Sequence, residues 1–304
     1  KIVCGATNAR KKMKSVLAKI GSVIKPHSKE EFTISKSIIR GIESNGMLCS
    51  ENELGLSNES DGIIELGSNY KVGEKFSSYI DDDMIEIEIA ITPNRVDCAG
   101  VYGIARDLNA SGFGSLKIKK ITNHKHKFKS SIKIFNKLKN ETCPSASFRE
   151  IRNVKNIASP PDIIKRFNGS GLKVISSLVD VTNYLTVDYC RPLHVFDLDK
   201  IEGDITIRYS DENESFLGLD EKNYKLEKNM IVICDDKKII SLAGVMGGMN
   251  SACDENTKNI LIESAYFLPE KIASTGRKLN IVSDARYRFE RGIDPNSIVE
   301  GIEL

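Results

Sequence analysis

The hydrophobic pattern of about the first 90 residues consists of short runs rather than long repeats. β-Branched runs of a few residues alternate with Gly, Asn, Pro and charged turns, which is typical of short strands. The stretch DMIEIEIA alternates apolar and acidic residues, as a half-exposed strand does. We predict strands at 1–6, 15–24, 32–42 and 84–91. Many short strands with little helix indicate a small barrel, and an OB-type barrel, a fold that often binds oligonucleotides, fits best.

A helical period follows this β-rich region. Asp97 is placed to cap a helix, and Gly112 and Gly114 follow its end. The apolar residues between them recur at helical spacing: Val101, Ile104, Ala105 and Leu108. We predict that this helix closes the first domain, which then covers residues 1–114.

From about residue 143 the pattern predicts a second domain of mixed α/β type, in which strands predominate. Ser159 as N-cap, Pro160 as the first helical residue and Gly169 near the end predict a short helix. A second helix is expected over SSLVDVTNYLTVDY. Further strands are expected at SASFREIRNV, DITIRYS, NMIVICDD, KIISLAGVMGG and NILIESAYF. The whole chain is therefore predicted to be α+β, with residues 143–296 as the second domain.

The segment 115–142 between these regions is strongly basic. Nine lysines, two histidines and no acid lie between Ser115 and Asn140. Such a run forms a solvated connecting segment or an exposed strand pair, or else a surface that contacts phosphates, because clustered lysines displace counterions from a nucleic acid. Lys125, Lys127 and Lys129 are the candidates for contact with nucleic acid.

Composition narrows the class of protein. A length of 304 residues is usual for two domains, and 40% hydrophobic residues suffice for real cores. No apolar run approaches the roughly 20 residues of a membrane span, so no contact with a membrane is expected. The seven cysteines form no CxxC pair, which argues against a zinc site and for a reducing compartment, the cytoplasm. The missing initiator Met and an end within an apparent helix suggest a fragment.

Four groups in the second domain are candidates for chemistry. His194 lies in RPLHVFD, with Thr182 and Asn183 upstream on a predicted helix. Gly244 and Gly247 belong to AGVMGG, which leaves bare backbone at the end of an apolar strand. In NILIESAYF, Glu263 is a carboxylate among apolar residues, which is costly unless it has a partner or a function.

Each of these residues also has a structural explanation. A lone His is usually packed or on the surface, glycines after a strand usually form a turn, and Glu263 at an alternate strand position can face water. The arginines and acids of SDARYRFERGIDP fit a salt-bridged surface strand or turn. The chain contains no GxSxG, P-loop or HExxH motif. Spacing alone therefore leaves the chemistry open.

Several long stretches occur together in a recognisable order. They are IVCGATN, SNGMLCSENELGL, GIIEL, ITPNRVDCAGVYGIARDL, LVDVTNYLTVDYCRPLHVFDLDKIEG, GVMGGMNS, ILIESAYFLP and SDARYRFERGIDP. In these the chain resembles the β subunit of bacterial phenylalanine–tRNA ligase, over nearly its whole length. The resemblance implies a tRNA-binding OB-type domain that lacks its first strands, followed by an editing domain. Residues 297–304 would begin the next domain.

The resemblance also implies a function, which is hydrolysis of tyrosine wrongly attached to phenylalanine tRNA. A hydrophobic pocket cannot strongly reject an analogue that merely adds a hydroxyl, whereas a second pocket that hydrogen-bonds the hydroxyl rejects phenylalanine. The implied partners are phenylalanine tRNA and the ligase α subunit, in an α2β2 enzyme. That whole enzyme uses ATP and Mg²⁺ to attach phenylalanine, and no cofactor or metal is expected in the fragment.

The resemblance assigns roles to individual residues. Glu263 would recognise the tyrosine hydroxyl, while His194 would orient the tRNA end or the attacking water. The base that activates the water is either a protein group or the tRNA ribose. The remaining implied residues line the pocket wall or the site near the ester: Gly244, Gly247, Ala285, Ser283, Asn183 and Thr182. Ser283 occupies a position where a related sequence has Thr. Two alternatives remain, a tRNA-binding module and a structural module, each without editing activity.

Overall fold

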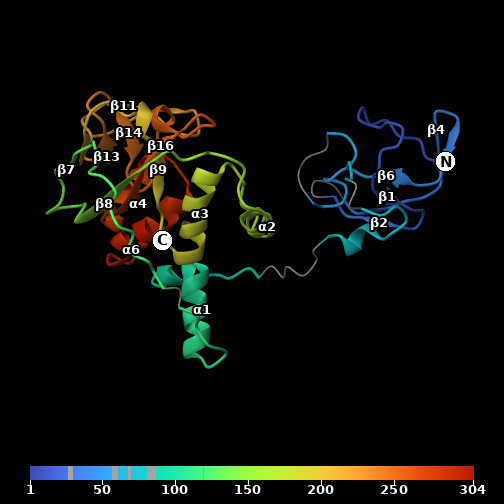
Figure 1. The fold of residues 1–304 in the computed structure, drawn as a ribbon, viewed down its shortest axis with the longest axis horizontal. Helices are drawn as coiled ribbons and strands as arrows, with labels where there is room; N and C mark the ends of the chain where they lie inside the picture. The colour runs from blue at the N-terminus through green and yellow to red at the C-terminus, as the bar shows by residue number, and fades with distance from the viewer. Residues whose placement is uncertain (27–29, 57–60, 68–69, 81–86, 119) are drawn as a thin grey trace. The chain divides into compact units, whose positions relative to one another are not determined.

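The computed structural model describes the chain in two compact units, Lys1–Ile85 and Glu86–Leu304 (Figure 1). Residues 27–29, 57–60, 68–69, 81–86 and 119 lie outside the described part. Each unit is considered by itself. Among the described residues, no helix is long and apolar enough to cross a membrane.

The first unit consists of short strands around a small core. Its strands pair antiparallel as β1–β6, β2–β3 and β4–β5. A few buried residues form the core: Val16, Ala18, Ile24, Ile34 and Cys49. The strands are Leu17–Ala18, Val23–Ile24, Phe32–Thr33, Ser37–Ile39, Ile42–Ser44 and Met47–Leu48 (β1 to β6).

The predicted OB-type barrel is not confirmed, because these three sheets do not join into one closed sheet. Closure needs strands long enough for a continuous stagger, and these span two or three residues each. The predicted strands at 15–24 and 32–42 are present in pieces. Residues 1–6 form no strand, nor do 87–91, and 84–86 lie outside the described residues.

The helix that we assigned to the first domain lies in the second unit. It is α1 (Val101–Ala110), it packs against α3 (Ser177–Tyr189), and its N-cap is Gly100 rather than Asp97. Asp97 lies in the preceding 3-10 turn, where its carboxylate accepts hydrogen bonds from Arg95. The carboxylate is thus held by a guanidinium instead of by helix N–H groups.

The second unit is built on two sheets. The larger has the order β15-β14-β13-β10-β7, antiparallel except for the parallel pair β10–β7. The smaller is antiparallel, with the central strand β16 between β8 and β9. The bounds are Ile134–Asn136 (β7), Ser145–Arg152 (β8), His194–Asp197 (β9), Ile205–Tyr209 (β10), Ile231–Cys234 (β13), Ile239–Leu242 (β14), Met246–Gly247 (β15) and Asn259–Tyr266 (β16). A hairpin is formed by Ser215–Leu217 (β11) and Asn223–Lys225 (β12).

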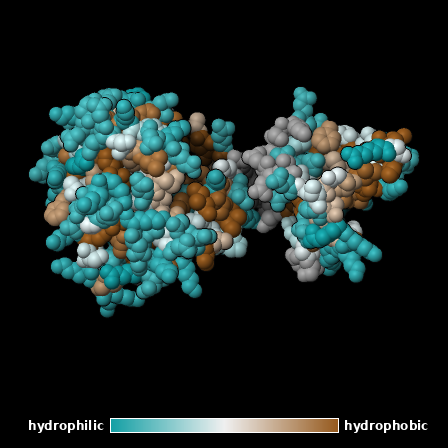
Figure 2. Space-filling model, turned by 90° about the horizontal axis from the view of Figure 1, so that it is seen from above, coloured by the Kyte–Doolittle hydropathy of each residue, from teal (hydrophilic) through white to brown (hydrophobic). Residues whose placement is uncertain are grey.

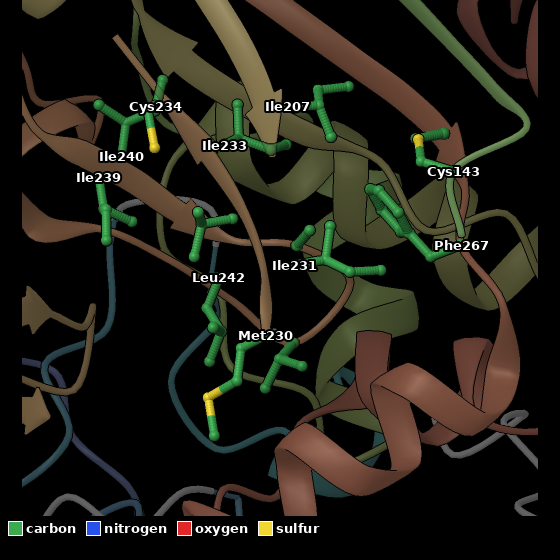
Figure 3. Close-up of a cluster of buried hydrophobic side chains, with 14 of the residues drawn as sticks. Cys143, Ile207, Met230, Ile231, Ile233, Cys234, Ile239, Ile240, Leu242 and Phe267 are labelled. Carbon is green, nitrogen blue, oxygen red and sulfur yellow. The ribbon is translucent and has the colours of Figure 1, made fainter. Parts of the chain in front are cut away.

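One large hydrophobic core fills the second unit. Figure 3 shows its β13 and β14 side chains, including Ile233 and Leu242, with Cys143 and Phe267 on the opposite side of the view. Strands β13 and β14 are buried at every residue, which agrees with their uninterrupted apolar sequences. Polar residues cover much of the visible face of this larger unit in Figure 2.

Helices complete the second unit, and some of them differ from the predictions. Helix α2 (Pro161–Gly169) begins one residue later than expected, with Pro160 as its N-cap. Ser159 instead donates a hydrogen bond of 2.6 Å to the buried carboxylate of Asp180 in α3. Residues interpreted as a surface strand or turn form α5 (Asp284–Phe289), and α4 (Pro269–Lys278) was not predicted.

The predicted domain boundaries also differ from the observed units. Strand β7 lies inside the basic segment 115–142, yet it pairs with β10 in the larger sheet. Residues 297–304, expected to begin another domain, contain α6 (Ser297–Glu303), which packs on β8 and β16. Both segments therefore belong to the second unit, together with 143–296.

Candidate functional site

Two of the candidate residues are direct neighbours across two strands. In the antiparallel pair of β9 and β16, Glu263 lies opposite His194, and on its other side it lies opposite Phe148 of β8. Opposed residues in such a ladder have Cβ atoms about 5 Å apart. Since β16 is the central strand and β9 an edge strand, Glu263 lies deeper in the sheet than His194.

The strand alternation turns Glu263 towards the core. Leu261 and Ala265, two positions away on either side, both belong to the main hydrophobic cluster. The exposed fraction of Glu263 is only 6%, so it does not face water as the alternative explanation required. No hydrogen bond to its carboxylate is found among the described residues. A largely buried carboxylate without a donor is costly, which favours a use beyond folding at this position.

Burial shifts the ionisation of both residues in opposite directions. Burial raises the pKa of Glu263 to about 7, although the positive charge of Arg191 partly opposes this. Burial lowers the pKa of His194 to about 4, so its imidazole is neutral at pH 7. A neutral imidazole can accept one hydrogen bond and donate another, but with this pKa it is a weak base. His194 is better suited to orienting a water molecule than to taking its proton.

Gly247 lies directly against His194. A Cβ atom at this glycine would lie 2.2 Å from Cε1 of His194, closer than any real contact. Gly247 does not have the positive φ that would explain a glycine by turn geometry. The glycine is therefore needed for the close approach of β15 to the imidazole ring.

Gly244 has a different role. Its φ is +67°, in the left-handed region that favours glycine. A Cβ there would meet side-chain carbons of Ile272, Phe267 and Phe289 at 3.0 to 3.2 Å. Gly244 therefore makes a turn against the packed core, and a Cβ at this position would point into the core rather than into open space.

Ser283 joins the glycine-rich loop to α5. Its hydroxyl donates to the carbonyl of Val245 at 2.6 Å and accepts from the N–H of Arg286 at 3.1 Å, which caps α5. Ala285, two residues on, is half-buried and packs against the main core. These two residues thus support the loop that carries Gly247.

Thr182 and Asn183 lie on α3, which packs against β9. The hydroxyl of Thr182 is buried and donates to the carbonyl of Val179 at 2.7 Å, within the helix. Asn183 is half-buried. Among the described residues, no hydrogen bond joins either side chain to His194 or Glu263, so the structure places them on a neighbouring element rather than in the His194–Glu263 pair.

The three candidate lysines are exposed on an extended segment. Lys125, Lys127 and Lys129 all face solvent. The segment is attached to the second unit at His124, whose N–H donates to Glu303 at 2.9 Å, and at Ser131, whose N–H donates to Glu150 at 2.9 Å. The three lysines therefore lie on a stretch that is held to the second unit at both ends. Among the described residues, none of them contacts His194.

Sequence reasoning missed Arg191, the largest fully buried side chain in the described part of the chain. Its guanidinium donates to the carbonyl of Ala265 and, at 3.2 Å, to the hydroxyl of Ser297. Burial lowers the pKa of Arg191 to about 10, so it keeps its charge at pH 7. An arginine in the apolar stretch YCRPLHVF was the available signal.

One group of potential metal ligands lies elsewhere, near α1. The side-chain donor atoms of Asp97, Cys98 and Asp107 lie within 4.8 Å of one another. Arg95 already donates to both carboxylates, at 3.0 and 2.7 Å. The hydrogen bonds from Arg95, with its charge as a smaller cause, lower the pKa of Asp97 to about 2. A guanidinium thus supplies the positive charge that a metal ion would bring.

Comparison with known families identifies both parts of the chain. The B3/4 domain model matches residues 142–304, which include His194, Gly247 and Glu263. The model of a putative tRNA binding domain matches residues 1–75. The chain therefore belongs to the B3/4 domain family.

Full-length relatives define the match more closely. The chain is 47% identical to the phenylalanine–tRNA ligase beta subunits of Brucella abortus and Mesorhizobium japonicum, and 43% identical to that of Bartonella quintana. Each match covers the whole chain but only 37% or 38% of the relative. The resemblance to this β subunit, drawn from the sequence motifs, is thus confirmed.

A solved structure shows a weaker likeness. It is an N-terminal fragment of the phenylalanyl-tRNA synthetase β-subunit from Pyrococcus horikoshii. The identity is 14% and the TM-score 0.36, over 62% of this chain and 60% of that one. A likeness at this level is too slight to support conclusions about the site.

Proposed function

We propose that the second unit hydrolyses tyrosine attached in error to phenylalanine tRNA. The observation that carries this proposal is the buried carboxylate of Glu263, which has no donor among the described residues and lies beside His194. A phenolic hydroxyl would supply the missing donor. Phenylalanine would leave the carboxylate buried and unpaired, so the same group rejects the correct amino acid.

The positions of the two residues fit the two ends of the substrate. Glu263, on the central strand, would accept the hydrogen bond of the tyrosine hydroxyl deep in the site. His194, on the edge strand, would hold the water near the ester. The water oxygen bonds to the ester carbonyl carbon, the bond to the ribose oxygen breaks, and tyrosine and tRNA are released. The proton of the water passes, by way of a protein group or the neighbouring ribose hydroxyl, to the departing ribose oxygen, which becomes a hydroxyl of the released tRNA.

The rate would come chiefly from positioning. An aminoacyl ester is already activated, and a water held at the correct angle supplies much of the acceleration. The neutral state of His194 suits this role, because it can accept a hydrogen bond from the water without being protonated. Gly247 would keep the ring in place by allowing β15 to approach it.

The wider assembly is part of the same proposal. The match of residues 1–75 to a putative tRNA binding domain supports contact of the first unit with tRNA. The relatives are ligase β subunits, which supports an α subunit as partner. An α2β2 enzyme in the cytoplasm is the assembly that we propose for it. ATP and Mg²⁺ would serve aminoacylation by the whole enzyme rather than hydrolysis at Glu263.

A tRNA-binding or structural module without editing activity is the competing function. One observation favours it, namely that the ring of His194 fills the space beside Gly247. A tyrosine side chain would therefore need His194 or its neighbours to move. Hydrolysis assays separate the two functions.

The decisive experiment compares the release of tyrosine and phenylalanine from phenylalanine tRNA by the 304-residue chain. Glu263→Ala should lower tyrosine release by about 10- to 100-fold, the value of a hydrogen bond to a charged group. Slow release of phenylalanine should persist. The matched control is Glu255→Ala, at an exposed turn position. A wild-type chain that releases no tyrosine, or a Glu263→Ala variant that discriminates as well as wild type, would refute the proposal.

A further inference from the structure

Arg191 is a buried cation without an ion-pair partner among the described residues. Its exposed fraction is 1%, and no carboxylate is within ion-pair distance in that part of the chain. Arginine is almost never fully buried unless it is paired, because removing the charge from water is costly. Something other than a direct ion pair must therefore offset the cost of burying this charge.

The hydrogen bonds of Arg191 hold its guanidinium in one place. It donates to the carbonyl of Ala265 on β16 and to the hydroxyl of Ser297 on α6. Gly301 lets α6 approach, since a Cβ there would lie 2.7 Å from Cγ of Arg191. The ring of Phe289 lies 5.8 Å from the guanidinium carbon. The side chain is therefore fixed between β16 and α6.

This location places the charge beside the recognition carboxylate. Ala265 is two positions beyond Glu263 on β16, so the carbonyl that the guanidinium contacts lies only about 7 Å along the strand from Glu263. Arg191 is also three residues before His194, the cross-strand neighbour of Glu263. The positive charge acts on Glu263 through low-dielectric protein, where attraction is stronger than in water.

The other titratable groups near this pair carry no charge at pH 7 or act on the arginine. His194 is neutral, and the thiol of Cys143 stays protonated because burial and the charge of Glu263 raise its pKa to about 12. Cys190 and Asp294 act on Arg191 and favour its charged form. Among the described residues, the positive charge of Arg191 thus opposes the effect of burial on the pKa of Glu263.

We propose that Arg191 is a positioning residue of the editing site, whose buried positive charge favours the ionised form of the Glu263 carboxylate, the form that accepts the hydrogen bond of the tyrosine hydroxyl. This inference rests on the proposed function of Glu263. An ionised carboxylate is only an acceptor and bonds a phenol strongly, whereas a protonated one bonds it more weakly. Arg191 would thereby set the lower pH limit of tyrosine release.

The test measures tyrosine release against pH and, independently, the titration of the Glu263 carboxyl carbon by ¹³C NMR in the 304-residue chain. Arg191→Gln removes the charge but keeps an amide donor for Ala265. Its pH profile should move upwards by at least one pH unit, so that release at pH 6 falls about tenfold and recovers at pH 9. Arg191→Lys keeps a charge and should restore the wild-type midpoint.

Ser297→Ala is the structural control, because it removes one hydrogen bond of the guanidinium but not the charge, and its midpoint should not move. A folded Arg191→Gln variant with the wild-type midpoint in both measurements would overturn the inference. If the wild-type chain releases no tyrosine at any pH, the proposed function fails. The titration of the Glu263 carboxyl group then still shows whether Arg191 lowers its pKa.

A last measurement needs no substitution of Arg191. In the wild-type chain, the Nε–H signal of Arg191 should shift with the same midpoint as Glu263, and Glu263→Gln should abolish that shift. A signal that stays constant between pH 6 and 8 would contradict the coupling of the two residues.

Discussion

Glu263→Gln should stabilise the protein at pH 8 and have little effect at pH 5. The pKa of Glu263 is raised by burial from its usual 4.5 to about 7, so at intermediate pH the folded protein holds a proton that the unfolded chain has released. Stability therefore falls as the pH rises from about 4.5 through 7, and above 7 the whole penalty is present. The difference between these two pKa values corresponds to about 3 kcal/mol. Gln has nearly the same shape and carries no charge, so it removes this penalty.

Thermal unfolding followed by far-UV circular dichroism measures the effect, since the chain has no tryptophan to report by fluorescence. At pH 8 the variant should melt roughly 6 to 12 °C above wild type, at 2 to 4 °C per kcal/mol. The lowered pKa of His194 makes the folded protein more stable as the pH rises. This contribution is the same in wild type and variant, so it cancels in the difference between their melting temperatures. Glu255→Gln, at an exposed site, is the control. Parallel stability profiles of wild type and Glu263→Gln from pH 5 to 8 would refute the reasoning.

Two further predictions concern the glycine loop and the basic segment. Gly247→Ala should lower tyrosine release by displacing the ring of His194, with little loss of stability, whereas Gly244→Ala should cost about 1 kcal/mol or more because of its positive φ and crowded core. Melting temperatures and release rates of both variants test this contrast, and a fully active Gly247→Ala would contradict it. Replacing Lys125, Lys127 and Lys129 by Ala should flatten the salt dependence of tRNA binding by about 0.7 to 0.9 log unit for each phosphate contact. An unchanged slope in filter binding would leave these lysines as a solvated surface.

The sequence predicted strands β8, β10, β13, β14 and β16 of the second unit, because long apolar runs such as NILIESAYF leave few alternatives to a buried strand. It did not predict the short strands β9, β11 and β12. It failed where tertiary contacts override local signals. Asp97 and Ser159 look like helix caps, yet Arg95 binds the first and Asp180 accepts from the second. The OB-type barrel is not confirmed, because short runs predict strands but not the register that would close them.

The candidate site was predictable in its residues but not in its arrangement. Motif resemblance selected His194 and Glu263, whereas their direct opposition depends on the register of β9 and β16. Gly244 and Gly247 have different roles because they differ in φ and in the side chains next to them. The sequence AGVMGG does not reveal this difference. Arg191 was missed because burial of a charge depends on tertiary structure alone.

The parallel pairing of β7 with β10 changes what the basic segment is. Its start follows α1, which packs on α3, and β7 lies near its end, so the stretch between them is anchored in the second unit on both sides. It is therefore a closed loop on one body and not a hinge between two bodies. Binding of its lysines to a polyanion would order a loop whose ends are already fixed, at a smaller cost in chain entropy than ordering a free tether. A single proteolytic cut within this loop would likewise leave α1 and β7 each held by their own contacts.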